Sequence, residues 1–485
     1  MEPQKISRRS LLMGSALASV GIPLQAQPSE MTTLGEGVLV QKTGTQYDIR
    51  QFGAVGDGSH LDTDAIQRAI DECHAAGGGI VVAPPGTYRT GAIRLRSHVT
   101  FDVSSGARII GSDNLDDYRI DEELVGLISA VDGEDIHLIG QGTLDGNGDA
   151  FADWESLKPG GSAEFHIDGP VAMHHRPGNM ITFSNCRNIS MTGLTIVDAP
   201  FWTIHLDGCT DGSLANLRIR NNPLIPNNDG IHCTTSRNVR IQNCDIVAGD
   251  DAIAITGIND HGPIIPGFIG YDQPTENILV NDCILESRSV GVRVGYGHND
   301  VRHCIFSNLI IRHSHRGLGV FSRNSGSIQN IAFSNIQIET RFYDGPWWGN
   351  GEAIHVSTAP QFSDEPLGEI QGVAFQGIRA SSPTGILLHG DASVPIRDLT
   401  LRDIELRMAM DPLLAERATT MDIQPANMES HGILEREPAA LFCKHIDGLN
   451  LTNVTLRWDI LEDAHEPIRM KHVEHYQLNG LSFTR

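Results

Sequence analysis

Short stretches in which apolar and polar residues alternate recur along most of the chain. Many share an Asn-x-(Ile/Val)-x-(Ile/Val) core, and neighbouring copies lie roughly 20–30 residues apart, with some longer gaps. This alternation is typical of strands with one buried face. The copies span Asn188–Ile196, Ser213–Ile219, Asn238–Ile246, Asn277–Ile284, Cys304–Ile311, Ile328–Ile338, Ile370–Ile378, Ile396–Ile404 and Leu449–Leu456.

A repeat of this length indicates a coil of stacked turns. One strand-turn-strand unit cannot bury its apolar face alone, so neighbouring units must pack on each other. The chain lacks the leucine-rich-repeat frame, and a propeller blade needs about 40 residues. The pattern therefore predicts an all-β protein built as a parallel β-helix.

The N-terminal part of the repeat region predicts a cap over about residues 47–90. Asp62 is a helix-capping residue, and three consecutive glycines from Gly77 end the helical pattern. An amphipathic helix here would cover the open end of the coil, where unpaired strand edges favour aggregation. Its predicted buried stripe consists of Ala65, Ile66, Ala69, Ile70 and Cys73. Residues 408–437 interrupt the repeat and are predicted to form a long loop or helical excursion.

Composition agrees with a strand-rich globular protein. The 485 residues include 51 glycines, with 6% aromatic and 40% hydrophobic residues. With 36 basic and 60 acidic side chains, the formal charge is −24, which argues against a general nucleic-acid binder. We expect no nucleic-acid partner and a monomer.

Residues 1–26 are predicted to be a twin-arginine signal peptide. Arg8 and Arg9 precede a short apolar run that ends at Leu24, and this run is too short for a good membrane span. The remaining chain, 27–485, is predicted to be one catalytic β-helix domain. We expect a periplasmic or secreted protein with no membrane association after signal removal.

The eight cysteines form no C-x-x-C pair, which argues against a zinc site. Cys186, Cys209 and Cys233 lie 23 and 24 residues apart, a spacing that suggests one column of buried side chains. We expect mostly free, buried thiols.

Three carboxylates form the candidate catalytic cluster. Asp229 lies 21 residues before Asp250, about one turn of the predicted coil, and Asp251 is adjacent. Equivalent positions on neighbouring turns lie about 4.8 Å apart, so these acids should share one outer face. Clustered carboxylates repel, which raises at least one pKa and keeps a proton available near neutral pH. Glycosidic bond hydrolysis requires such a pair of acid and base.

At these residues the sequence resembles the polygalacturonase-like glycoside hydrolases of family 28. The family's N-T-D-G motif matches Asn227-Asn228-Asp229-Gly230, and its G-D-D motif matches Gly249-Asp250-Asp251. The resemblance covers most of the chain after the signal. It also includes Phe52–Gly58, Gly142–Gly148, Arg176–Pro177, Ser184–Cys186 and Ala199–Ile204.

The resemblance implies a right-handed parallel β-helix that hydrolyses a pectin-type poly- or oligosaccharide with inversion. It implies Asp250 as general acid and Asp229 and Asp251 as the groups that activate water, with a wide acid–base separation. Asn227 would contact the substrate. Neither a cofactor nor a metal ion is expected.

Two family motifs are changed. Val290 replaces the histidine of G-H-G, and Gly319 and Phe321 replace the arginine and lysine of R-I-K. These family residues ordinarily hold an acidic sugar. Arginine binds carboxylates bidentately, so other residues on the next one or two turns could rebuild the pocket. The candidates are Arg293, His298, Arg316 and Arg323. Separately, His232, two residues past Gly230, could replace the missing histidine or be satisfied within its own turn.

A glycine- and proline-rich segment, 343–352, contains Trp347, Trp348 and Glu352. Sugar faces pack on aromatic rings, and loops beside a rigid scaffold carry binding groups. We expect this loop to contact substrate, and Glu352 or His355 to meet the terminal sugar. Burial of both indoles against the coil wall is the alternative.

Two other function classes stay open. A polysaccharide lyase would need a Ca²⁺ site, for which Asp250 and Asp251 are candidates, and a base such as Arg293. A binding protein that has lost catalysis would retain the coil and bind carbohydrate without turnover.

Overall fold

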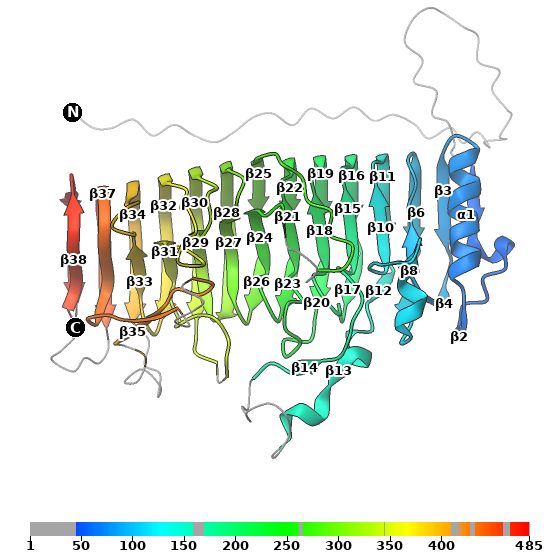
Figure 1. Cartoon of the computed structure of the whole chain (residues 1–485), viewed down its shortest axis with the longest axis horizontal. Helices are drawn as coiled ribbons and strands as arrows, with labels where there is room; N and C mark the ends of the chain where they lie inside the picture. Colours follow the sequence, from blue (N-terminus) through cyan, green and yellow to red (C-terminus); the bar gives the residue numbers. More distant parts are fainter. Residues whose placement is uncertain are drawn as a thin grey trace, which may run out of the picture. The chain divides into compact units, whose positions relative to one another are not determined.

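The computed structural model describes residues 45–158, 169–260, 265–343, 345–408, 417, 419–426, 432–458 and 466–484. Within these ranges, 34 strands form one sheet whose strand pairs are all parallel (Figure 1). The predicted signal peptide lies outside them. Among these residues, no helix has the length and apolarity needed to cross a membrane.

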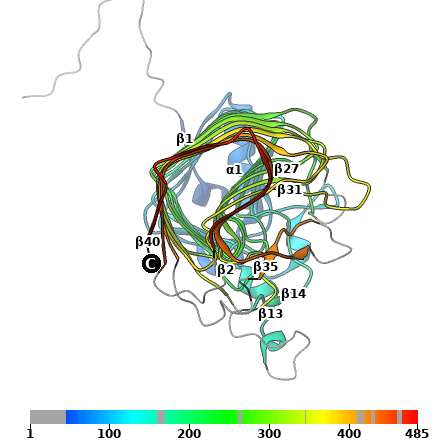
Figure 2. The same ribbon diagram turned by 90° about the vertical axis from the view of Figure 1, so that its left-hand side faces the viewer.

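The strands stack in three ladders, and Figure 2 shows the turns overlying one another. The first contains β1 (Gln46–Asp48), β3 (Gly79–Ala83), β6 (Val99–Val103), β11 (Glu134–Gly140), β16 (Arg187–Thr192), β19 (Thr210–Ala215), β22 (Arg237–Gln242) and β25 (Thr275–Asn281). The second contains β2 (Asp57–Leu61), β4 (Gly86–Thr90), β7 (Ala107–Gly111), β12 (Thr143–Asp145), β17 (Thr195–Val197), β20 (Arg218–Arg220), β23 (Asp245–Ala248) and β26 (Ile284–Ser287). The third, which carries the candidate site, contains β5 (Ile93–Arg94), β10 (Ile128–Val131), β15 (Ile181–Ser184), β18 (Ile204–Asp207), β21 (Ile231–Thr234), β24 (Ile253–Gly257), β27 (Val290–Gly297), β29 (Arg316–Ser322), β31 (Ile354–Thr358) and β33 (Ile386–His389).

In the later turns the first two ladders merge into long bent strands. These are β28 (Val301–Ser314), β30 (Ile328–Thr340), β32 (Ile370–Ser382), β34 (Ile396–Met408) and β37 (Ala439–Trp458). The start of β37 also pairs with β33 and so continues the third ladder, and β38 (Glu466–Glu474), β39 (Gln477–Asn479) and β40 (Ser482–Thr484) pair with β37. This architecture confirms the predicted parallel β-helix. Connections between parallel strands of one sheet are right-handed in nearly all proteins.

The remaining elements are short and lie outside the ladders. Three antiparallel pairs are β8 (Arg119–Ile120) with β9 (Glu123–Leu124), β13 (Ala152–Asp153) with β14 (Ala172–Met173), and β35 (Thr420–Asp422) with β36 (Ile433–Glu435). The helices are α1 (Thr63–Ala75) and the 3₁₀ segments η1 (Ile49–Phe52), η2 (Leu115–Tyr118), η3 (Gly148–Phe151) and η4 (Trp154–Leu157). The pair β35–β36 falls within the predicted excursion at 408–437.

The recurrent asparagines occupy the bends of the coil. Asn238, Asn277, Asn308 and Asn335 have left-handed φ values of 57°, 59°, 56° and 53°. Asparagine tolerates this conformation better than most residues. Each amide also bonds to the turn before it: Asn277 Nδ2 donates to Asn238 Oδ1 at 3.1 Å, and Asn335 Nδ2 to Asn308 Oδ1 at 2.8 Å. Asparagine therefore recurs in the sequence for two reasons: it fits the left-handed bend, and its amide bonds to the equivalent bend of the preceding turn.

The cap helix forms as predicted, with one difference in its capping. All five predicted stripe residues are buried, and the helix ends just before the glycines. The Asp62 carboxylate, however, makes no capping bond to the helix. It accepts hydrogen bonds from the N–H groups of Val55 at 2.7 Å and Gly56 at 3.1 Å, and so fixes the preceding loop.

All eight cysteines are free and buried. Cys186 and Cys209 are neighbours on successive turns, but Cys233 does not continue their column. The residue that follows Cys209 in this column is Ser236, whose hydroxyl accepts the Cys209 N–H bond at 2.9 Å. Cys233 lies in β21 and pairs with Leu206. The interval from Cys209 to Ser236 is 27 residues, so the 24-residue spacing was coincidental.

The number of residues per turn varies while the third ladder stays in register. Ile231 pairs with Ile253, Ile253 with Val292, Val292 with Leu318 and Leu318 with Ile354. These steps span 22, 39, 26 and 36 residues. Loops outside the ladders absorb the difference.

We predict that Phe333→Ala destabilises the coil by about 3–5 kcal/mol, because it removes a buried ring and leaves a cavity. The Phe333 ring stacks between Phe306 and Phe375 with centroids 4.8 Å away on both sides. Chemical denaturation would measure the loss. Phe362→Ala, at a 49% exposed ring, is the matched control and should change stability little. Equal losses in the two variants would contradict a continuous stacked core.

Candidate functional site

The three aspartates lie at the start of adjacent strands in the third ladder. Asp229 precedes β21, and Asp250 and Asp251 precede β24. The N–H of Gly230 donates to the carbonyl oxygen of Asp251 at 2.9 Å, and Ile231 pairs with Ile253. Asp229 is therefore in register with Asp251, 22 residues later, and Asp250 is displaced by one position. The sequence spacing had paired Asp229 with Asp250, 21 residues later. The residue that the ladder pairs with Asp229 is the next one, Asp251.

Asn228 and Gly249 hold the two acidic turns together. The Asn228 Oδ1 accepts the Gly249 N–H bond at 2.5 Å, and its Nδ2 donates to the Asn222 carbonyl at 2.8 Å. A Cβ atom on Gly249 would lie 2.3 Å from the Ile225 carbonyl oxygen and 2.7 Å from Asn228 Oδ1. This close approach explains why glycine precedes the aspartate pair.

Each buried acid has a cationic or titratable partner. Arg293 Nε lies 2.7 Å from Asp251 Oδ2, and the Val290 N–H donates to Asp251 Oδ1 at 3.3 Å. His232 Nδ1 lies 3.2 Å from Asp229 Oδ2, while its Nε2 lies 3.0 Å from the Thr256 hydroxyl. Asp229 and Asp251 are buried, whereas Asp250 is partly exposed. Val290 therefore contacts the acidic cluster through its backbone N–H, and Arg293 contacts it through its side chain.

Burial and mutual repulsion perturb the acids strongly. Burial, together with Asp251, raises the pKa of Asp250 to about 6, against the opposing effect of Arg293. Burial and the charges of Asp250 and Asp251 raise the pKa of Asp229 well above its usual value. The three acids in turn raise the pKa of Arg293, although burial opposes this. The cluster therefore retains a proton at mildly acidic pH.

A second cation is connected to Asp250 through Asn227. The Asn227 Nδ2 donates to Asp250 Oδ2 at 3.3 Å, and Arg176 donates to Asn227 Oδ1 at 2.9 Å. Arg176 also donates to the carbonyl groups of Pro200 and Pro226, at 2.9 and 2.7 Å. Burial lowers the pKa of Arg176 to about 10, opposed by Asp250 and Asp229, so it stays charged at neutral pH.

Two cavities meet at Asn227. The larger, of 630 Å³, is called here the cation-lined cavity, and its walls are Leu115, Arg119, Leu124, His174, His175, Arg176, Phe201, Trp202, Asn227, Ile265 and Pro266. The smaller, of 120 Å³, is called the tryptophan-lined cavity, with walls Pro170, Pro226, Asn227, Asp250, Ser289, Pro346, Trp347 and Trp348. Asp250 and both predicted tryptophans thus face one space.

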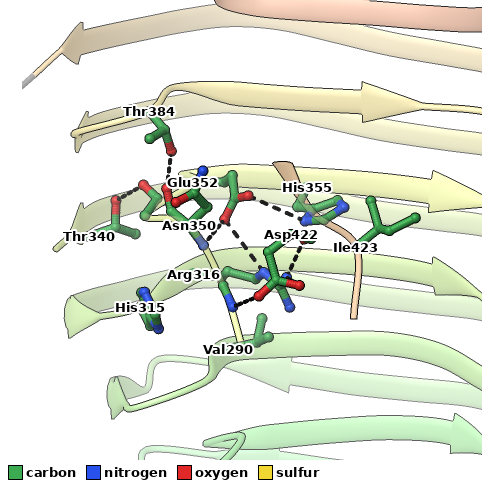
Figure 3. A network of polar contacts seen from close by, with 12 residues as sticks. Val290, His315, Arg316, Thr340, Asn350, Glu352, His355, Thr384, Asp422 and Ile423 are labelled. Carbon is green, nitrogen blue, oxygen red and sulfur yellow. Dashed lines mark hydrogen bonds and ion pairs between the residues drawn. The ribbon is translucent and has the colours of Figure 1, made fainter. Parts of the chain in front are cut away.

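Three predicted substrate-binding residues are instead buried in a polar network. Arg316 Nε lies 3.5 Å from Glu352 Oε2, and an Arg316 Nη atom donates to the Asp422 carbonyl at 2.5 Å (Figure 3). Arg323 donates to the carbonyl groups of Ser357 at 3.0 Å and Ile423 at 2.8 Å. The segment 419–426 covers these side chains.

This placement differs from the predicted role of Arg316, Arg323 and Glu352. They are 1%, 0% and 1% exposed, so a sugar cannot reach them while segment 419–426 stays in place. Figure 3 also places His355 beside Glu352, with Nδ1 3.8 Å from Oε1, rather than at a sugar-binding rim.

His298 is exposed and lies apart from the acids. Its Nδ1 is 3.2 Å from the Ser325 hydroxyl and 3.7 Å from Glu365 Oε1. No described contact links it to the aspartates or to either cavity. The predicted group of cations is therefore split: Arg293 and His232 lie at the acids, and the others do not.

The arrangement suits acid–base chemistry on a ligand that enters from the cavities. Asp250 offers a partly exposed carboxyl that keeps its proton in mildly acidic solution, and Arg293 Nε lies 2.7 Å from the Asp251 carboxylate. The sequence analysis missed Arg119, His174, His175 and Ser289 as wall residues. Nothing in their local sequence distinguishes them, because distant turns bring them together.

Comparison with known proteins identifies close relatives of this architecture. Residues 79–420 match the family Glycosyl hydrolases family 28, and residues 47–107 match Rhamnogalacturonase A/epimerase, pectate lyase-like. A protein of Arabidopsis thaliana named "Probable polygalacturonase" is 30% identical over 393 residues, covering 75% of this chain and 74% of that protein. A "Probable polygalacturonase" of Vitis vinifera is 24% identical over 385 residues, covering 74% and 73%.

Solved structures share the fold. The family 28 exopolygalacturonase of Yersinia enterocolitica superposes with a TM-score of 0.66 at 19% identity, covering 90% of this chain and 79% of that one. The exopolygalacturonase of Thermotoga maritima gives 0.61 at 21% identity, covering 75% and 87%. These likenesses confirm the predicted right-handed β-helix.

We predict that Asp250→Asn stabilises the fold at pH 7.5 by about 1–2 kcal/mol and has little effect at pH 4. The raised pKa of Asp250, about 6, means that the folded state binds more protons than the unfolded state in mildly acidic solution. The contribution of this carboxyl to stability therefore falls as the pH rises toward neutrality. Thermal unfolding across this pH range would measure it.

The exposed Asp364→Asn is the matched control, and its stability should follow the wild type at each pH. A destabilisation by Asp250→Asn that is equal at both pH values would contradict the repulsive cluster.

Proposed function

Since the chain belongs to glycosyl hydrolase family 28, we propose that it hydrolyses a pectin-type poly- or oligosaccharide with inversion at the anomeric carbon. The cluster of Asp229, Asp250 and Asp251, of which Asp250 faces the tryptophan-lined cavity, carries this proposal. The names of its relatives, which are polygalacturonases, support a substrate that contains uronic acid.

Asp250 is the proposed general acid. It is the most exposed of the three acids, it faces the tryptophan-lined cavity, and its raised pKa keeps it protonated in mildly acidic solution. Its proton passes to the glycosidic oxygen as the bond from that oxygen to the anomeric carbon breaks. This transfer stabilises the leaving alcohol in the transition state.

Asp229 and Asp251 are the proposed groups that position and activate water. Arg293 orients the Asp251 carboxylate, with its Nε 2.7 Å from Asp251 Oδ2. A water molecule between these acids loses a proton to one of them while its oxygen bonds to the anomeric carbon. Attack from the face opposite the leaving group inverts the configuration.

The other two function classes have less support. A lyase mechanism would require Arg293 to act as a base, but the neighbouring acids raise its pKa and keep it protonated. A binding protein without turnover would not require the repulsion among the three aspartates. A lyase would also yield products that absorb ultraviolet light.

We also propose that the protein is exported through the signal in residues 1–26 and acts as a monomer of one catalytic domain, 27–485. The paired arginines ahead of an apolar run support export. Fractionation with N-terminal sequencing of the processed protein tests the proposal.

We predict that Asp250→Asn lowers kcat on pectic oligosaccharides by a factor on the order of 10²–10⁴ with little change in KM, because the proton donor is lost. Product anomers followed by NMR should be inverted in the wild type. Asp364→Asn should retain wild-type turnover. Wild-type kcat in Asp250→Asn, or retained configuration, would refute the acid assignment or the inverting mechanism respectively.

We predict that the wild-type kcat declines as the pH rises through about 6, the pKa of Asp250. The acid must carry its proton to act, so the basic limb of the pH profile reports its ionisation. Arg293→Gln removes a charge that lowers this pKa, and the basic limb should move to higher pH. An unchanged limb would contradict the coupling between the two groups.

A further inference from the structure

The two cavities that share Asn227, whose Nδ2 donates to Asp250, differ in chemistry. The cation-lined cavity contains two arginines and two histidines among its walls, and none of its described wall residues is acidic. The tryptophan-lined cavity contains no cationic residue among its described walls, and its one charged group is Asp250. A sugar unit on one side of the scissile bond therefore meets a different environment from a unit on the other.

The cation-lined cavity suits a uronic-acid unit. Arg119 is exposed at its wall, with Nε 3.5 Å from Asp116 and an Nη donating to the Glu122 carbonyl at 3.0 Å. Arg176, a second wall residue, is held by Asn227 and two carbonyl groups. Guanidinium groups bind carboxylates with both charge and directed hydrogen bonds.

The tryptophan-lined cavity suits a neutral sugar. Trp347 and Trp348 provide apolar surfaces for the C–H face of a sugar ring, and Ser289 and Asn227 provide polar groups at the edge. A carboxylate placed here would face Asp250 without a compensating cation from the described walls. A charge left without a partner in a partly buried site is unfavourable.

Arg316 and Arg323 cannot supply that cation, because a buried network uses both, and Arg293 is already paired with Asp251. Arg316 contacts Glu352 and Asp422 (Figure 3). Arg323 bonds to backbone carbonyl groups. The same network fixes the tryptophan loop: the Gly349 N–H donates to Asp422 Oδ2 at 2.6 Å. Asn350 Nδ2 donates to the Thr420 carbonyl at 2.9 Å. The neutral wall is thus preorganised.

We propose that the substrate is a mixed glycan, in which a uronic-acid unit occupies the cation-lined cavity and a neutral sugar occupies the tryptophan-lined cavity, with the bond between them cleaved at Asp250. This inference rests on the proposed hydrolase function and refines its substrate class. It also accounts for the loss of the family's arginine and lysine at Gly319 and Phe321, which a neutral sugar does not need.

The test compares three oligosaccharides of equal length: a homo-oligomer of galacturonic acid, its carboxyl-reduced neutral form, and an oligomer that alternates a uronic acid with a neutral sugar. We expect kcat/KM for the alternating oligomer to exceed both others by at least about tenfold, equal to about 1.4 kcal/mol. Equal or faster hydrolysis of the homo-oligomer overturns the inference and leaves the hydrolase function intact. Hydrolysis of none overturns both.

Binding to Asp250→Asn, measured by calorimetry, separates recognition from turnover. In the Asp250→Asn background, Arg119→Gln should weaken binding of the alternating oligomer about tenfold and leave binding of the carboxyl-reduced oligomer unaffected. In the same background, Trp347→Ala should weaken binding of both oligomers. Arg240→Gln, at an exposed arginine on β22, is the matched control and should alter neither. Equal weakening of both oligomers by Arg119→Gln would overturn the assignment of the uronate subsite.

Discussion

Backbone hydrogen bonding between successive turns, kept at constant register, is the constraint on which this molecule depends. It places one residue from each turn along a single line of the third ladder: Asp229, Asp251, Val290, Arg316 and Glu352. Their positions follow from the ladder and not from the side chains. The sequence can therefore change the chemistry of this line one turn at a time without altering the scaffold.

The line has two functional regions. At Asp229 and Asp251 it lies beside Asp250, which faces the tryptophan-lined cavity, and burial together with repulsion among the acids keeps a proton in the site. At Arg316 and Glu352 the same line is covered by segment 419–426, and the charges neutralise each other. Partnered charges in a buried position are costly to separate. This cost keeps the covering segment, and the tryptophan loop attached to it, in place beside the reactive end.

The parts of this structure that are local or periodic could be predicted from sequence. Alternation and the Asn-containing bends indicated the coil, and the spacing of Asp229 from the Asp250–Asp251 pair indicated the cluster. The exact register, and the separation of Cys233 from its supposed column, depended on turn lengths that the sequence does not reveal. The partner of Arg316 is Asp422, about a hundred residues away, so no local pattern distinguished a sugar ligand from a buried ion pair.

The unequal lengths of the turns have an evolutionary consequence. Steps of 22 to 39 residues preserve the same pairing through β21, β24, β27, β29 and β31. Insertions at the joints between ladders therefore add surface without moving the reactive groups. In such a scaffold the catalytic residues and the residues that select the substrate can evolve separately. A lineage can acquire new carbohydrate preferences by lengthening loops while its catalytic turn remains intact.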